Sequence, residues 1–230
     1  MPLRLFRDRS FAVANVVGVL FSLGISGALF ILIQFLQVAQ GATALEAGVR
    51  TMPWTMAPLV VAPLTGLIAP RIGVCPAIVA GLACMTASPI WIALVLDADV
   101  EYIRLVPPYA LVGIGMGLVF APIASAVLEG IAQEDQAVAS GTNSTAREIG
   151  VALGIAALSS VFTTVGGELS PDGFSDGAVP AIAVGAIALA AATLAGLLLL
   201  GFKPVRISPL TGEPVVRHRA EQPRAKQLQR

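Results

Sequence analysis

The chain alternates long apolar runs with short polar connections. Each run approaches or exceeds the ~20 residues that a helix needs to cross the hydrocarbon layer of a bilayer. Six such runs lie at Phe11–Gln37, Thr51–Ala69, Ala77–Leu96, Leu105–Leu128, Ile149–Val165 and Val179–Phe202. We therefore expect an all-α fold, a polytopic membrane protein whose six-helix transmembrane domain covers residues 11–202. Residues 1–10 form a short lead-in, and residues 203–230 form a polar, basic tail that we expect to be disordered.

Composition supports a membrane protein and excludes several other classes. Hydrophobic residues make up 56% of the chain and charged residues only 12%, which is outside the usual range of soluble domains. The formal net charge of zero indicates no nucleic-acid partner. Cys75 and Cys84 lie nine positions apart on one expected helix and cannot bridge, and His218 has no potential metal ligand near it in the sequence. We expect no metal, no cofactor and no enzymatic activity.

The distribution of Lys and Arg predicts the orientation. Cytoplasmic loops of membrane proteins carry the excess of these residues. With the N-terminus inside, only Arg50 and Arg104 lie outside, and the other twelve of the 14 basic residues lie inside. We expect a multi-pass protein of the plasma (inner) membrane with both termini cytoplasmic.

The segment Ala137–Gly154 is small, polar and rich in glycine, unlike the apolar runs around it. On one helix Asn143, Arg147, Gly150 and Gly154 form a single stripe, because they lie at offsets of 0, 4, 7 and 11. Glycines four residues apart let another helix backbone come close. We expect Gly113 and Gly117 to form a second such pair, because no strand precedes them as a nucleotide-binding loop would require.

Two further features concern the first and second runs. Gln34 and Gln37 share one face in the outer half of the first run. They are either interfacial caps or a hydrogen-bonding wall of an aqueous cavity. Pro53, Pro58 and Pro63 predict that the second helix is kinked or partly unwound, because proline removes a backbone donor.

The order of these motifs resembles that of a known transporter family. The run Ala139–Gly154 is similar to the Ala-Ser-Gly-x-x-Asn-x-x-Arg-Gln-x-Gly-Gly-Ala-x-Gly segment of fourteen-helix drug:proton antiporters of the major facilitator superfamily. The lead-in Phe6–Phe11, the segment Gln40–Pro53 and the glycines up to Pro122 resemble the same family in the same order. The resemblance covers nearly the whole chain and implies the C-terminal half of such a transporter, with two inverted three-helix repeats.

Two departures from the family pattern affect what the resemblance implies. The inner-loop motif Gly66, Arg71 and Gly73 resembles the superfamily's Gly-x-Leu-x-Asp-Arg-x-Gly loop, but Pro70 replaces the acid. Glu148 stands where the family commonly has Gln. The first departure puts the charge relay of that loop in doubt.

The resemblance implies multidrug or small-molecule efflux by proton antiport, with the substrate held near the midplane between two six-helix halves. Candidate cavity residues are Gln34, Gln37, Trp54, Thr55 and Met56, and candidate gate and packing residues are Gly141, Asn143, Arg147, Gly150, Gly154, Gly113 and Gly117. Arg147 has an alternative role as an interfacial anchor. Because no titratable group falls in the middle of the six runs, we expect the coupling acid in the missing half.

The expected partners are the lipid bilayer, a small amphipathic substrate and an N-terminal half that is missing or separately encoded. Two alternatives remain open at this point. The chain could be a half-size transporter that acts as a homodimer. It could also be a membrane remnant or an interaction subunit that does not transport.

Overall fold

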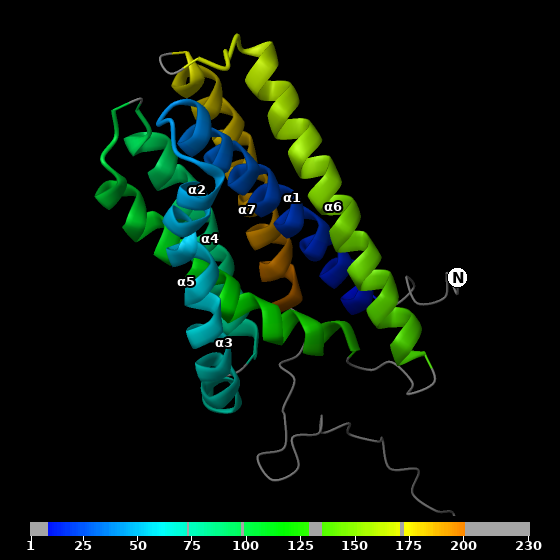
Figure 1. The fold of residues 1–230 in the computed structure, drawn as a ribbon. Helices are drawn as coiled ribbons and strands as arrows, with labels where there is room; N and C mark the ends of the chain where they lie inside the picture. Colours follow the sequence, from blue (N-terminus) through cyan, green and yellow to red (C-terminus); the bar gives the residue numbers. More distant parts are fainter. Residues whose placement is uncertain (1–8, 73, 98, 129–134, 171–172, 201–230) are drawn as a thin grey trace, which may run out of the picture.

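The computed structural model describes residues 9–72, 74–97, 99–128, 135–170 and 173–200, and all of its regular elements are helices. They form one bundle of roughly aligned helices (Figure 1). Their bounds are α1 Arg9–Val38, α2 Ala44–Arg50, α3 Met52–Ile72, α4 Val74–Val95, α5 Tyr102–Leu128, α6 Gln136–Thr164 and α7 Phe174–Leu200. Most of the lead-in and the basic tail lie outside the described residues.

Length and composition identify the membrane spans. Helices α1, α4, α5, α6 and α7 are each long and apolar enough to cross a membrane. The short α2 and the first part of α3 could form a sixth span together, bent by 40° where they meet. The prediction of an all-α, polytopic membrane bundle is confirmed.

The helix contacts follow an internal two-fold pattern. Helix α1 packs against α6 and α7, α5 packs against α3 and α4, and α4 packs against α7. Exchanging α1 with α5, α3 with α6 and α4 with α7 reproduces the same set of contacts. A pattern of this kind is expected of two inverted three-helix repeats.

Glycine contacts repeat the same symmetry. A side chain at Gly24 of α1 would begin 2.7 Å from the carbonyl oxygen of Gly185 in α7. In the related pair of helices, a side chain at Gly81 of α4 would begin 2.8 Å from the carbonyl oxygen of Gly115 in α5. Each central helix, α1 and α5, therefore approaches its neighbour through a pair of glycines.

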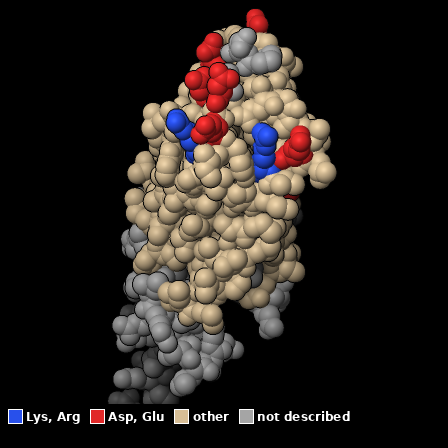
Figure 2. Space-filling model, turned by 60° about the vertical axis from the view of Figure 1, so that its left-hand side comes forward, with Lys and Arg blue, Asp and Glu red and all other residues tan. Residues whose placement is uncertain are grey.

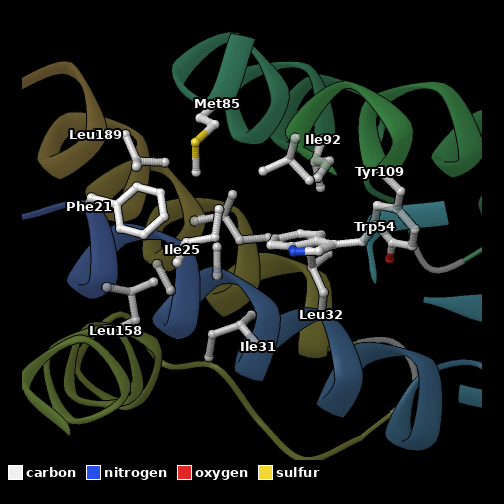
Figure 3. Close-up of a cluster of buried hydrophobic side chains, with 14 of the residues drawn as sticks. Phe21, Ile25, Ile31, Leu32, Trp54, Met85, Ile92, Tyr109, Leu158 and Leu189 are labelled. Atoms are coloured by element: carbon white, nitrogen blue, oxygen red, sulfur yellow. The ribbon is translucent and has the colours of Figure 1, made fainter. Parts of the chain in front are cut away.

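The core fills the space between these helices with large apolar side chains. Figure 3 shows Phe21 and Ile25 of α1 on the side of Met85 of α4 and Leu189 of α7, with Leu32 further along α1. All five are buried. The two repeats thus share one continuous core.

Charged side chains gather at one end of the bundle. On the face in Figure 2 the described surface below that end carries no Lys, Arg, Asp or Glu. The charged residues in this part of the chain include Glu46 and Arg50 of α2, Asp97 and Glu101 of the loop before α5, and Arg104 of α5. An uncharged belt next to a charged end is what a helical bundle presents to lipid and to water, respectively.

Three elements differ from the sequence expectation. Helix α6 begins at Gln136, 13 residues before the apolar run that starts at Ile149. Helix α2 was not foreseen. The second span was expected to be kinked or partly unwound; α3 is a continuous helix from Met52 to Ile72, and a bend of 40° lies just before it, between α2 and α3.

The packing of α5 explains how α3 accommodates its prolines. Pro58 cannot donate a hydrogen bond to the carbonyl oxygen of Trp54, four residues earlier. That oxygen lies against Gly113 of α5, 2.5 Å from where a side chain of Gly113 would begin. The close backbone of α5 covers the carbonyl that proline leaves free.

Candidate functional site

The contact between α1 and α6 is built on glycine. A side chain at Gly150 would begin 2.5 Å from the carbonyl oxygen of Val19, and one at Gly154 would overlap the backbone of Leu23. From the other helix, a side chain at Gly27 would begin 2.7 Å from the carbonyl oxygen of Gly154. Because these obstacles are backbone atoms, no rotation of a side chain can make room for a larger residue.

A polar contact continues this interface. The side-chain amide of Asn143 donates a hydrogen bond of 3.3 Å to the side-chain oxygen of Asn15 on α1. The amide of Asn15 in turn donates to the carbonyl oxygen of Phe11 at 2.8 Å. Both asparagines are buried, so this short chain of hydrogen bonds fixes the register of α6 on α1.

Arg147 lies between α1 and α5 and faces aromatic rings. Its guanidinium carbon lies 4.5 Å from the centre of the Phe120 ring and 5.9 Å from that of Phe21. The two rings meet edge to face at 5.6 Å. Gly18 leaves space for the aliphatic part of Arg147. A Cβ atom added at Gly18 would lie 3.4 Å from Cγ of Arg147. The buried Nε of Arg147 has no hydrogen-bond partner among the described residues.

The glycines of α5 face two helices. A side chain at Gly117 would begin 2.6 Å from Val61 of α3, on the same side as the contact of Gly113 with α3. Gly115 faces α4 instead and meets Gly81 and Met85. Because the glycines stand at every second position, they allow α5 to pack closely against both α3 and α4. The pattern Gly113-x-Gly115-x-Gly117 contains all three glycines, but only Gly113 and Gly117 were predicted to pack against another helix.

The cavity candidates divide into exposed and enclosed side chains. Trp54 is only 3% exposed and meets Tyr109 edge to face, with ring centres 6.0 Å apart. Figure 3 places its ring beside Leu32 in the core. Thr55 and Met56 follow it on α3 and are exposed, Met56 by 48%. The remaining two cavity candidates, Gln34 and Gln37 of α1, are half-buried.

Other candidates are open or cannot be placed. A side chain added at Gly141 of α6 or at Gly66 of α3 would meet nothing within 4 Å. Neither glycine is needed for packing within the described part of this chain. Gly73 lies outside the described residues, as does the side chain of Arg71.

A network at the charged end of the bundle was not predicted. Arg50 donates a hydrogen bond of 2.9 Å to the side-chain oxygen of Gln40, whose amide donates to the carbonyl oxygen of Val100 at 2.9 Å. Tyr102 donates to the carbonyl oxygen of Arg50 at 3.0 Å. These bonds join the connection around α2 to the loop before α5. Two of the three bonds join residues 60 and 52 positions apart, so no local sequence signal identifies the network.

The chemistry of this arrangement is packing, hydrogen bonding and charge placement. Within the described part of the chain, no group of three or more His, Cys, Asp and Glu residues could hold a metal ion. What the arrangement provides is a set of long helices in tight contact, with one cation held between aromatic rings.

Comparison with known proteins identifies the family. The sequence profile of the Major Facilitator Superfamily matches residues 2–155, about two thirds of the chain. The chain belongs to the Major Facilitator Superfamily. The predicted likeness to this superfamily is confirmed.

Several similar proteins are named for drug transport, drug resistance or export. The chain is 29% identical to the multidrug transporter protein MdtP of Bacillus subtilis over 75% of its own length and 32% of that protein. It is 28% identical to the tetracenomycin C resistance and export protein of Streptomyces glaucescens, over 79% of this chain and 34% of that protein. It is also 34% identical to the multidrug resistance protein Stp of Mycobacterium tuberculosis, over 70% and 30%. The chain therefore spans about a third of the length of these relatives.

Proposed function

We propose that the chain forms the C-terminal six-helix half of a fourteen-helix drug:proton antiporter and exports small amphipathic molecules together with an N-terminal half. Relatives named for drug resistance and export support this proposal, as does the match to about a third of their length. The two-fold pattern of helix contacts supports it too, since halves of such transporters consist of inverted repeats.

The outward face of α6 is the observation that carries the proposal. Of the five helices that qualify as spans by themselves, α6 is the least apolar and has the smallest buried share. Gly141, Ser144, Thr145 and Glu148 are all exposed on it. Lipid is a poor environment for such a surface, whereas a second protein half or a water-filled path suits it.

Roles within this half follow from the placement of its residues. Thr55 and Met56 are exposed on α3 and can contact a substrate, whereas Trp54 stands behind them and holds this part of the wall against α5. Gln34 and Gln37 would offer amide groups to a polar part of the substrate. Flexible and soft side chains such as methionine suit varied apolar compounds.

Arg147 is the gate residue in this proposal. It lies next to the tight α1–α6 contact, and the rings of Phe21 and Phe120 hold it without a salt bridge among the described residues. A cation held this way can exchange its aromatic contact for an acidic group of the other half when the helices move.

Drug accumulation tests the proposal. A fluorescent lipophilic cation is measured in bacteria that lack their own exporters and express the chain alone or with its N-terminal half. Export that appears only with both halves, and that a protonophore abolishes, is the expected result. Export by the chain alone would favour a homodimer, and no export in either case would contradict a transport function.

A further inference from the structure

Helix α6 presents three different faces along its length. The packing face consists of buried residues against α1, including Asn143, Gly150 and Gly154. A second face is apolar and exposed, with Ile149 at 53% and Leu153 at 51%. The third face carries small and polar residues at offsets of 0, 4, 7, 11 and 22, and all of them are exposed: Gly141, Thr145, Glu148, Ala152 and Thr163. We call these five residues the polar stripe.

Glu148 is the charged member of the polar stripe, and it lies within the membrane span. It follows the start of α6 at Gln136 by 12 residues and precedes the end at Thr164 by 16. At 1.5 Å per residue these distances are about 18 Å and 24 Å. If the helix is centred on a hydrocarbon layer of about 30 Å, the carboxylate lies roughly 10 Å inside that layer.

Packing against α1 gives a second estimate of depth, counted from the start of the α1 span instead of from the middle of a helix. Gly150, two residues beyond Glu148, lies against the backbone of Val19. The apolar span of α1 begins at Phe11, eight residues before Val19. Eight residues of helix correspond to about 12 Å, so Glu148, two residues before Gly150 on a helix parallel to α1, lies about 9 Å beyond the level of Phe11. Both measures place Glu148 below the surface of the hydrocarbon layer.

Few charged residues lie near Glu148 in the described part of the chain. Arg147, its neighbour in sequence, is the nearest charge and interacts with it electrostatically, although its side chain is directed to Phe21 and Phe120, about 100° further round the helix. The described span of α1 from residue 11 carries no charged residue. On the other helices that pack against α6, the described charged or titratable groups lie toward the ends where α5 and α7 begin: Tyr102, Arg104 and Tyr109 on α5, and Asp176 on α7.

We propose that Glu148 is a proton-carrying carboxylate of the transport cycle and lies on the wall of the aqueous path. This inference rests on the proposed function. A carboxylate at this depth is costly against lipid, and the polar stripe around it suits water or the other half of the transporter. The carboxylate takes one proton from water on one side of the membrane and returns it to water on the other. One O–H bond forms and later breaks, and nothing is oxidised or reduced.

Proton counting tests the inference in the complete transporter reconstituted into vesicles. The measurement is the gradient of a lipophilic cation that balances an imposed pH gradient, which gives the protons exchanged per substrate. Glu148→Gln should exchange one proton fewer than the unmodified protein, and Glu148→Asp should keep the original number. Glu168→Gln is the matched control, because it removes an exposed acid between α6 and α7.

The outcomes separate the two proposals. An unchanged proton count in Glu148→Gln would overturn the role of Glu148 and leave the proposed function standing. Absence of any pH-driven transport by the unmodified protein would contradict the proposed function itself.

A second readout does not depend on transport. A hydrophobic carbodiimide reacts with protonated carboxyl groups within the membrane, and mass spectrometry locates the adduct on the chain in vesicles. Glu148 should be labelled more strongly as the pH falls, and Glu168 should stay unlabelled by the membrane-embedded reagent. Absence of labelling at Glu148 across the pH range would overturn the inference.

Discussion

At the scale of single residues, the environment of Arg147 shows how a cation is held inside an apolar bundle. The guanidinium group contacts two aromatic rings and no carboxylate among the described residues. A cation over an aromatic face gains about 0.5–2 kcal/mol, more when water is excluded. The Phe120 ring, at 4.5 Å, contributes the larger share of this interaction.

Phe120→Leu should therefore lower the unfolding free energy by about 1–2 kcal/mol, because it removes the cation–π contact while keeping an apolar side chain. Unfolding in mixed micelles measures the change. Phe30→Leu is the control, since Phe30 lies partly exposed on α1. The loss should shrink when Arg147 is already replaced by Met; an equal loss in both backgrounds would show that the ring acts by packing alone.

The hydrogen bond between Asn143 and Asn15 leads to a second prediction. Polar contacts between membrane helices contribute about 0.6 kcal/mol on average and up to roughly 1.7. Asn143→Ala should cost about 1 kcal/mol in the same unfolding measurement. In an Asn15→Ala background the cost should be smaller, because the partner is gone. Purely additive costs would contradict a direct interaction.

Residue roles were predictable from the sequence only where they depend on local spacing. The stripe from Asn143 to Gly154 was visible because one helix fixes its geometry. Three partners of this stripe were not identified, because each is distant in sequence: Asn15 lies 128 positions from Asn143, Gly18 lies on α1, and Phe120 lies 27 positions (147 − 120) before Arg147. Nothing in the local pattern of α1 or α5 marks them as partners.

At the scale of helices, glycine decides how closely α1 and α6 approach. Gly154→Ala should lower the unfolding free energy by about 1–3 kcal/mol, because the added methyl group meets the backbone of Leu23. Gly141→Ala is the matched control on the same helix, where nothing lies within 4 Å. It should be neutral or stabilising by roughly 0.5–1 kcal/mol, because alanine favours helix. Equal effects at both positions would contradict the packing role.

A comparison of predicted and observed helix ends shows which parts of the fold hydropathy can predict. Five long apolar runs gave helices close to their observed positions, because burial in lipid needs only hydropathy. The start of α6 was misplaced, because residues 136–148 are polar and are held by contacts with α1. Helix α2 had a local signal that hydropathy ignores: Thr43 and Glu46 form a capping box, with the Glu46 amide donating to Thr43 Oγ1 at 3.3 Å.

At the scale of the whole molecule, the two repeats differ in what they expose. Their contacts and glycine pairs match under the two-fold exchange, yet α3 presents Met56, Leu59 and Leu67 outward while its counterpart α6 presents the polar stripe. The equivalence of the repeats thus concerns how their helices pack, and their difference concerns the chemistry of the faces that they expose.

The orientation of the whole bundle gives the last prediction. Because the sequence predicts that twelve of the 14 Lys and Arg residues lie on one side, the chain should insert with both termini in the cytoplasm. Single cysteines test this in a background where Cys75 and Cys84 are replaced by Ser. Glu101→Cys, in the loop before α5, should react in intact cells with a maleimide that cannot cross membranes. Ala137→Cys, in the first turn of α6, should react only after the cells are opened. The reverse labelling pattern would show that the bundle has the opposite orientation. The carboxylate of Glu148 would then lie nearer the outer surface than the cytoplasm.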